Sequence, residues 1–510
     1  MALPSIKKAA SSALLVLRST KFFYGVVALL VIQAIWMTLT ARYPMAFDED
    51  FHFGIIQIYS HQWSPFITNN PPDSGAYGDL VRNTSLLYHY LMSFPYRLIA
   101  LFTQQEMVQV VALRFLNIAM FAGGLFVFRA VFSRLRFSPI VTNFSLLMIV
   151  LIPVVPFLAG QINYDNLMFL LVPLITLIAL RVGRAISSTG KLPLVDTTAL
   201  LSLCMLTSLV KYAFLPVFLA VLLYPAILII RHKNTGSIFK RTWSAFITST
   251  LPLKLTLVGC LVITSGLFIE RYGVNVVQYG DFQPDCDQVE SIEHCSQYGP
   301  FERNRQIAAT VKNDDSIPYD PAPILFVPEW IGGMMHRLYF AINYDYFNYY
   351  GLPVPILTAY IVGGVGFILC CFFFRRLFKN RELYLILAVA VVYTGAVFYV
   401  NLSGFMHLRQ MLAINGRYLI LILPFAFALM AAAYGLLIRK FIASKQAALY
   451  KAGLAVVVLL LTLQGGGILT FAVRSDPNWY WDNSFSQALG NGLKNISKPF
   501  IIGADHKERA

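Results

Sequence analysis

Apolar runs of similar length recur along the whole chain, and they restrict its fold more than any other feature. Each run is about 20 residues long, the length of an α-helix that crosses a bilayer. Such runs fold as helices because backbone N–H and C=O groups find no water within lipid. The chain is 57% hydrophobic and 13% charged, with a mean hydropathy of +0.63, and soluble domains carry about twice that charge. We therefore expect an all-α integral membrane protein of the cell membrane.

The runs predict about eleven membrane-spanning helices. The stretch from residue 194 to 230 is too long for one crossing and is interrupted by Lys211 and Pro216, so we expect two helices there. The membrane domain would occupy residues 1–472, and a tail, residues 473–510, would follow it. The predicted spans are residues 22–41, 108–130, 138–158, 165–181, 194–210, 213–230, 252–269, 353–374, 383–400, 418–437 and 452–472.

The distribution of basic residues predicts the orientation. The sequence has 40 Lys and Arg and 25 Asp and Glu, a formal net charge of +15. With the N-terminus in the cytoplasm, the short inner segments hold more than half of the basic residues and almost no acidic ones, as the positive-inside rule requires. The basic excess then reflects topology and contact with membrane lipids, and no nucleic-acid partner is expected. Two large extracytoplasmic loops, residues 42–107 and 270–352, and the tail place the function outside.

Two of the six cysteines, Cys286 and Cys295, lie close together in a polar part of the second outer loop. Paired cysteines outside the cytoplasm are typical of a disulfide in an oxidising compartment. The neighbouring His294 leaves a metal site open as an alternative. The other four cysteines fall within predicted spans.

Three consecutive acids, Asp48, Glu49 and Asp50, begin the first outer loop soon after a predicted span. Apolar residues at helical spacing predict a helix from Asp48 to Ser60, with the acids at its N-terminus. Acids in a first helical turn can simply complement the backbone dipole. Alternatively, a carboxylate held there stays ionised and can act as a general base beside the membrane. His52 follows Asp48 by one turn on the same face and would support it.

This opening of the first loop resembles the GT-C class of membrane glycosyltransferases, such as the protein O-mannosyltransferases and the lipid A aminoarabinose transferases. Two further elements are similar to that class: GQINYDNL, residues 160–167, and LTSLVKYAFLP, residues 206–216. The resemblance covers about the first 230 residues, and the later half matches in layout only. It implies a GT-C-like fold in which Asp48 is the catalytic base and Glu49 its catalytic partner. It also implies a polyprenyl-phosphate sugar as the donor.

Basic residues near the ends of predicted spans are candidates for binding the donor phosphate. Lys211 interrupts an apolar run, and His407, Arg409 and Arg417 lie near one another before the tenth span. Arginine binds phosphate oxygens through paired, charge-assisted hydrogen bonds. Any one of these side chains can instead extend to the lipid headgroups.

Two polar residues that follow the third span, Asn163 and Asp165, either position Lys211 and the donor or cap the fourth span. No cofactor is expected. Asp48 and Asp50 do form an Asp-x-Asp pair, which binds a divalent ion in metal-dependent members of the GT-C class, and hard oxygen ligands suit Mg²⁺. Residues two apart on a helix point to different faces, so a metal-independent reaction is favoured.

These features favour an enzyme that moves a sugar from a polyprenyl-phosphate carrier to an acceptor on the extracytoplasmic face, with inversion at the anomeric carbon. The acceptor, a lipid, glycan or protein of the cell envelope, stays open. A transporter or flippase of a lipid-linked sugar is one alternative, and an O-antigen polymerase or ligase is another. Transporters usually carry inverted repeats, and the sequence shows none.

Overall fold

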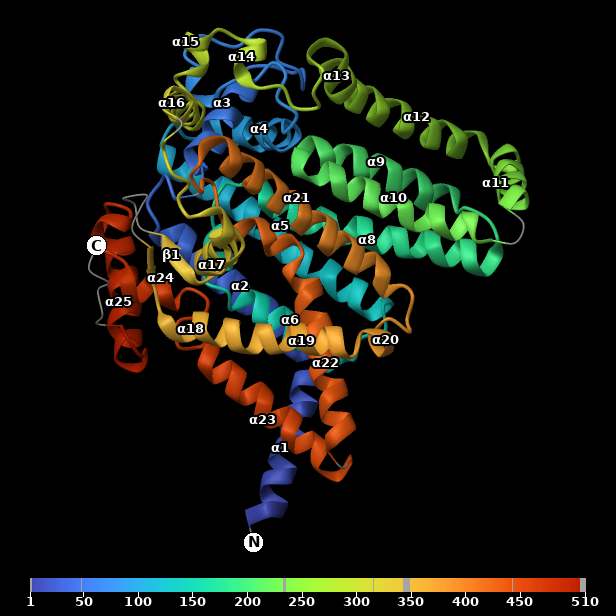
Figure 1. Cartoon of the computed structure of the whole chain (residues 1–510), viewed down its shortest axis with the longest axis vertical. Helices are drawn as coiled ribbons and strands as arrows, with labels where there is room; N and C mark the ends of the chain where they lie inside the picture. The colour runs from blue at the N-terminus through green and yellow to red at the C-terminus, as the bar shows by residue number, and fades with distance from the viewer. Residues whose placement is uncertain are drawn as a thin grey trace.

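The computed structural model describes residues 2–46, 48–232, 235–314, 316–342, 349–442 and 444–504. These residues form a bundle of helices (Figure 1), and the two strands among them, β1 (Phe340–Ile342) and β2 (Tyr349–Gly351), pair antiparallel. Within the described segments, eight helices are long and apolar enough to cross a membrane. At this level the predicted all-α, multi-pass membrane architecture is confirmed.

The eight long helices match eight of the predicted spans. Three shorter apolar helices, α6 (Pro139–Val150), α9 (Leu194–Val210) and α23 (Ser444–Thr462), match the other three. The number of helices that cross the membrane, about eleven from the sequence, stays a prediction. The long helices are α2 (Thr20–Thr40), α5 (Glu106–Arg134), α8 (Tyr164–Thr189), α10 with the turn before it (Tyr212–Ile230), α12 with α13 (Leu251–Tyr279), α18 with α19 (Pro353–Phe372), α21 (Leu383–Leu408) and α22 (Leu423–Phe441).

The predicted break in the stretch from residue 194 to 230 is confirmed. α9 ends at Val210, and Lys211 is extended, with φ −152° and ψ 118°, before a short turn leads into α10 (Leu215–Ile230). Pro216 occupies the first turn of α10, where the N–H that proline lacks would have no partner within the helix. Lys211 therefore lies at a turn between two helices rather than inside one.

The two large loops pack against each other at one end of the bundle, at the top of Figure 1. Nη2 of Arg82 lies 2.9 Å from Oε1 of Glu270, and Nδ2 of Asn70 donates a hydrogen bond to Oε1 of Glu290 at 2.8 Å. These contacts join segments about 200 residues apart in the chain. The loop helices are α3 (Glu49–Ser60) and α4 (Leu87–Ala100) from the first loop, and α14 (Cys286–Val289), α15 (Ile292–Cys295), α16 (Gly299–Asn313) and α17 (Phe326–Tyr339) from the second.

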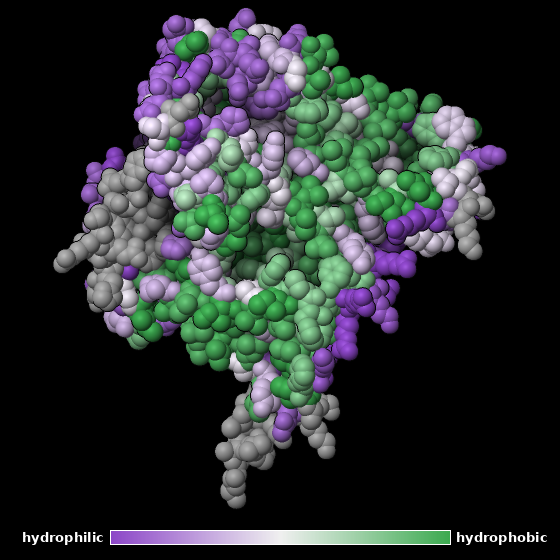
Figure 2. Space-filling view, in the orientation of Figure 1, coloured by the Kyte–Doolittle hydropathy of each residue, from purple (hydrophilic) through white to green (hydrophobic). Residues whose placement is uncertain are grey.

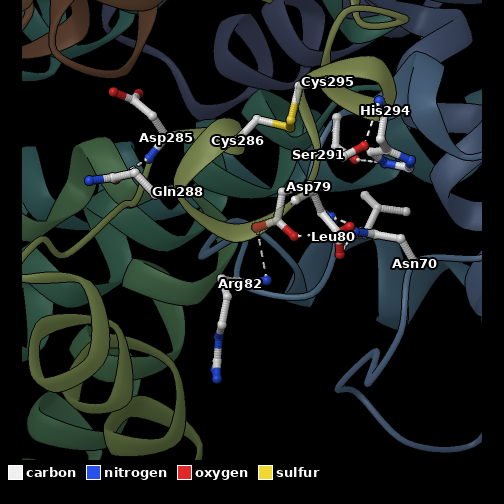
Figure 3. Close-up of a disulfide and its surroundings, with 12 residues drawn as sticks. Asn70, Asp79, Leu80, Arg82, Asp285, Cys286, Gln288, Ser291, His294 and Cys295 are labelled. Carbon is white, nitrogen blue, oxygen red and sulfur yellow. Dashed lines mark hydrogen bonds between the residues drawn. A yellow bond between two sulfur atoms is a disulfide. The ribbon is translucent and has the colours of Figure 1, made fainter.

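Cys286 and Cys295 form a disulfide, so that prediction is confirmed and the alternative of a metal site at these cysteines is wrong. Figure 3 shows the disulfide beside the turn of the first loop that contains Asp79. The Asp79 carboxylate accepts hydrogen bonds from the backbone N–H groups of Val81 and Arg82, at 2.8 and 3.0 Å. The disulfide therefore stabilises the part of the second loop that rests on the first.

The tail packs on the end of α2 that leads into the first loop. The backbone N–H of Arg42 donates to the carbonyl of Trp479, and that of Trp481 donates to the carbonyl of Thr40, both at 2.9 Å. Helices α24 (Leu469–Arg474) and α25 (Ser484–Ser497) complete the described tail, and residues 505–510 lie outside the described residues. The tail and the first loop therefore lie at the same end of the bundle.

Polar surface gathers at two ends of the molecule. Figure 2 shows hydrophilic residues over the loops at the top and along the lower right edge, with a broad hydrophobic surface between them. This is the distribution that a bundle embedded in lipid requires, because charged side chains are costly within the hydrocarbon. The helices away from the loop end include α1 (Ala2–Arg18), α11 (Thr235–Thr248) and α20 (Phe374–Leu377).

We predict that both loops and the tail face outward, while the N-terminus faces the cytoplasm. The first loop and the tail pack together, so they lie on one side of the membrane. The basic segments place the opposite side in the cytoplasm. A reporter that is active only outside the cell, fused after Lys507 (itself beyond the described residues), should be active. The same reporter after Arg381 should be silent. The reverse pattern would overturn the orientation, and two active fusions would contradict the placement of Arg381 and the tail on opposite sides of the membrane.

Candidate functional site

Asp48 stands at the entrance to α3 in a conformation that frees its side chain from capping. Its backbone is left-handed, with φ 66° and ψ 31°, and its carboxylate makes no capping hydrogen bond to the helix. Aspartate is one of the few residues other than glycine that adopts this conformation readily. The predicted helix is confirmed, with its first residue at Glu49. Capping therefore does not explain Asp48.

Asp48 instead forms an ion pair with Arg417, a residue more than 350 positions away in the sequence. Nη2 of Arg417 lies 2.6 Å from Oδ2 of Asp48. The side chain of Arg417 is 4% exposed and that of Asp48 is 59% exposed, so the pair has a buried cationic end and an accessible anionic end. A charge-assisted bond of this kind orients the carboxylate.

Close packing of the turn that carries Arg417 fixes its position. Gly416 and Arg417 begin a 3₁₀ turn before α22, and the side chain of Asn415 accepts a hydrogen bond from the backbone N–H of Arg417 at 3.1 Å. A Cβ atom on Gly416 would lie 2.1 Å from the carbonyl oxygen of Met334 in α17. Glycine is therefore needed for this turn to approach α17.

Glu49 has the opposite environment to Asp48, because it is fully buried and both of its oxygens are bonded. Nε and Nη2 of Arg114, in the middle of α5, donate to its two oxygens at 2.8 and 2.7 Å. The backbone N–H groups of Met45 and Ile162 donate to the same carboxylate at 2.8 and 3.0 Å. The resemblance assigns Glu49 a catalytic role, which stays a prediction; in the structure its carboxylate is occupied by Arg114 and by two backbone N–H groups.

The guanidinium of Arg114 connects Glu49 to the membrane helix and to the tail. Its Nη1 donates to the carbonyls of Thr38 and Ala41 at the end of α2, at 3.2 and 2.7 Å. It also lies 5.6 Å from the centre of the Trp481 ring, which belongs to the tail. Four separate segments of the chain therefore meet at one buried carboxylate.

A second ion pair, between Lys211 and Asp165, lies beside the first. Nζ of Lys211 is 2.6 Å from Oδ1 of Asp165, and both side chains are buried. Tyr418 links the two pairs, because Lys211 Nζ lies 4.9 Å and the Arg417 guanidinium 5.2 Å from the centre of its ring. Tyr164 covers Lys211 on another side, at 4.6 Å. The structure thus brings two of the predicted phosphate-binding cations to one aromatic wall next to Asp48.

Asn163 and Asp165 hold the start of α8 in place. The side chain of Asn163 is the N-cap and accepts the backbone N–H of Asp165 at 2.9 Å. Of the two roles that the sequence left open, Asn163 therefore caps the helix and Asp165 positions Lys211. Behind them, Oδ1 of Asn117 accepts hydrogen bonds from Tyr88 and Asn166, at 2.8 and 3.0 Å. Asn117, which accepts both of these hydrogen bonds, belongs to α5, the helix that carries Arg114.

His52 pairs with His89 of α4, which sequence reasoning did not single out. Nδ1 of His52 and Nε2 of His89 are 2.9 Å apart, and both rings are buried. Burial lowers the pKa of His52 well below its usual value, and the neighbouring His89, Arg417 and Lys211 lower it further. Burial also lowers the pKa of His89 to about 3, against a hydrogen bond to the Ser85 carbonyl that raises it. Both rings are neutral at physiological pH.

The second loop also borders Asp48. The ring of Tyr298 lies 5.7 Å from that of Phe51 in α3. Burial raises the pKa of Tyr298 to about 12, and the negative charge of Asp48 contributes to the shift. A phenol with this pKa stays protonated and can donate a hydrogen bond. Tyr298 is therefore a hydrogen-bond donor that the second loop brings close enough to Asp48 to sense its charge.

Two predicted residues make their contacts elsewhere. Arg409 donates to the carbonyl of Ile317 at 2.7 Å and lies over the ring of Tyr319, in the second loop. His407 is exposed and its Nδ1 lies 2.7 Å from the carbonyl of Ser403, one turn earlier in α21. The contacts described for these two residues do not join them to Asp48.

Among the described residues, no group of side chains completes the metal site that an Asp-x-Asp pair would need. Asp50 is exposed on the first turn of α3. No group of three or more His, Cys, Asp or Glu side chains that could hold a metal ion occurs among the described residues.

Comparisons with known proteins give no further assignment. No protein-family model matches the chain, and no significantly similar curated sequence was found.

We predict that Glu49→Gln destabilises the fold, because it leaves the buried charge of Arg114 without a counter-charge. Loss of one partner of a buried pair typically costs about 3–5 kcal/mol, so the unfolding temperature in detergent should fall clearly. Glu302→Gln is the control, because it breaks the exposed pair with Arg305 in α16 and should leave the unfolding temperature unchanged. Equal unfolding temperatures for all three proteins would show that Glu49 is not an anchor.

The histidine pair predicts a loss of stability in acid. The folded pKa values of His52 and His89 lie below the unfolded value of about 6.5, so their contribution is complete above pH 6.5 and is lost as the pH falls. Each histidine should remove about 1.4 kcal/mol per pH unit below the unfolded pKa. Unfolding temperatures measured from pH 7.5 downward should fall more steeply for the natural protein than for His52→Gln/His89→Gln. Parallel pH profiles would contradict the buried neutral pair.

Proposed function

We propose that the protein is a membrane glycosyltransferase that transfers a sugar from a polyprenyl-phosphate carrier to an acceptor outside the cytoplasm, with Asp48 as the general base. The observation that carries the proposal is the Asp48–Arg417 pair: an accessible carboxylate at the entrance to a loop helix, fixed by a buried arginine. A second cation, Lys211, faces the same tyrosine as that arginine. Base and phosphate-binding groups are therefore adjacent.

In the proposed reaction the acceptor hydroxyl or amine attacks the anomeric carbon of the donor. The proton of the acceptor passes to the free part of the Asp48 carboxylate as the new bond to the anomeric carbon forms. The bond from that carbon to the phosphate oxygen breaks, and its electron pair stays on the phosphate. Direct displacement inverts the anomeric carbon. A positioned general base typically contributes about 10²–10⁴-fold to the rate.

The departing polyprenyl phosphate gains negative charge, and the buried cations lie where that charge can be stabilised. Arg417 can present paired N–H groups to phosphate oxygens, and Lys211 adds a point charge. Both are largely removed from water, where an ionic contact is stronger than on the surface. The neutral His52 avoids adding a third positive charge to the pair of cations.

A fixed site favours an enzyme over a lipid-linked sugar carrier. Alternating access requires the binding site to rearrange between two sides of the membrane. Glu49, the residue next to Asp48, is instead held by buried hydrogen bonds to α5 and to the turn before α8, and Arg114 extends these bonds to the end of α2. Such anchoring suits a site that must hold donor and acceptor in line.

We predict that Asp48→Asn lowers turnover by about a hundredfold or more, because asparagine keeps the shape of the side chain but accepts no proton. A strain that lacks the protein should accumulate the unused lipid-linked sugar, which mass spectrometry identifies and which then serves as the substrate. The variant should fail to remove this intermediate. Asp48→Glu, which keeps the charge beside Arg417 but shifts the carboxylate, should show an intermediate loss.

Asp50→Asn is the matched control, since it removes a charge from the same turn of α3. It should retain most of the turnover. Equal severe losses at Asp48 and Asp50 would favour a metal-binding pair, while near-normal turnover of Asp48→Asn would reject the base. Retained binding of polyprenyl phosphate by inactive Asp48→Asn separates an enzyme from a carrier, because transport does not need the proton acceptor.

A further inference from the structure

Helix α11 (Thr235–Thr248), away from the loop end, presents three different faces. One face packs on the protein: Ile238 is buried, and the hydroxyl of Thr242 accepts the backbone N–H of Leu192 at 3.0 Å. The second is an exposed apolar ridge of Phe239, Trp243 and Ile247, which lie four residues apart and are 56%, 64% and 54% exposed. The spacing puts the three ridge residues on one side of the helix.

The third face of α11 lines a basic groove. The groove has a volume of about 630 Å³, and Lys191, Lys240 and Arg241 bring three positive charges to it. Ser244 and Thr248, one turn apart, add hydroxyl groups, and Thr189 closes the end. The lining thus combines cations with hydroxyl groups, the side chains that bind phosphate oxygens. Its volume lies in the usual range for a small-ligand site.

Two of the three cations have a structural explanation, and one does not. Nη1 of Arg241 donates to the carbonyl of Thr189 at 3.2 Å, at the C-terminal end of α8. Lys191 directly follows the C-cap of the same helix, and cations there complement the helix dipole. Lys240 is exposed on α11, and the end of α8 does not account for it.

The apolar ridge continues into a surface that faces lipid. Helix α12 (Leu251–Phe268) follows α11 directly, and its outward residues include Leu251, Leu255 and Val262, which are 64–67% exposed. Only 11% of the most apolar stretch of this segment is buried. Figure 1 shows α11 at the far end of α12 from the loops. The ridge and α12 together offer a continuous path for acyl chains beside the basic groove.

We infer that α11 lies in the membrane interface and that the groove binds the phosphate headgroup of an anionic phospholipid. The ridge of Phe239, Trp243 and Ile247 enters the acyl region, as in interfacial amphipathic helices. The phosphate lies between Lys191, Lys240 and Arg241, and the acyl chains run along α12. Each basic side chain at a membrane surface raises the affinity for anionic lipids by about fivefold. This site is separate from the chemistry at Asp48 and does not depend on it.

Quenching of Trp243 by brominated lipid tests the site. The full-length protein is reconstituted in phosphatidylcholine vesicles that contain a minority of either brominated phosphatidylglycerol or brominated phosphatidylcholine. The difference between the natural protein and Trp243→Phe isolates Trp243 among the six tryptophans. Brominated phosphatidylglycerol should quench Trp243 at a surface density about fivefold or more below that needed for brominated phosphatidylcholine. Equal quenching by the two lipids would overturn the inference.

Charge variants distinguish lipid binding in the groove from a general attraction of anionic lipid to a basic protein. Lys191→Gln/Lys240→Gln/Arg241→Gln should abolish the preference, measured against the same triple variant with Trp243→Phe. The matched control, Lys379→Gln/Arg381→Gln/Arg439→Gln, removes three exposed basic residues from other basic segments and should keep the preference. Equal loss in both would show that net charge alone attracts lipid. Inorganic phosphate should not restore Trp243 fluorescence; if it does, the groove is a site for free anions.

Discussion

The buried ion pair between Glu49 and Arg114 is the interaction on which the rest of the candidate site depends. Removing two charges from water is costly, and the cost is offset only when geometry and further hydrogen bonds are good. Here the backbone of Met45 and Ile162 completes the bonding of the carboxylate, while two carbonyls at the end of α2 hold the guanidinium. Such a pair specifies an arrangement more than it adds stability. It fixes where the first loop leaves the membrane helices.

Because the side chain of Glu49 points into the protein, the side chain of the neighbouring Asp48 points outward. Successive residues at a helix entrance point in different directions, and the left-handed backbone of Asp48 turns its side chain away from the end of α3. Arg417 then holds that carboxylate from the side opposite the solvent. The two adjacent acids therefore have different environments: Glu49 anchors the loop, and Asp48 remains accessible. The contrast comes from the backbone and from burial, since the two side chains carry the same functional group.

Local patterns in the sequence predicted the helices, the break at Lys211 and the disulfide, because each depends on residues close together in the chain. The partners inside the candidate site depend on tertiary packing. Nothing near Arg114 in the sequence identifies Glu49 as its partner, although an arginine within an apolar span was itself a signal of a polar function. The contacts described for Arg409 likewise involve the second loop, which follows from its left-handed backbone and not from its neighbours in sequence. The role predicted for His407 and Arg409 stays a prediction.

In the proposed reaction, Arg417 contacts both the Asp48 carboxylate and the departing phosphate. This gives a physical reason why the base and the leaving group would act together. One guanidinium cannot fully satisfy both the Asp48 carboxylate and a phosphate that is becoming more negative. In the proposed reaction, the growing charge on the phosphate would compete for the N–H groups of Arg417 as the bond to the sugar breaks. The carboxylate would then be released at the moment when the acceptor must lose its proton. One buried arginine between two anions would thus couple departure of the phosphate to proton transfer, and only interactions that strengthen in the transition state accelerate a reaction.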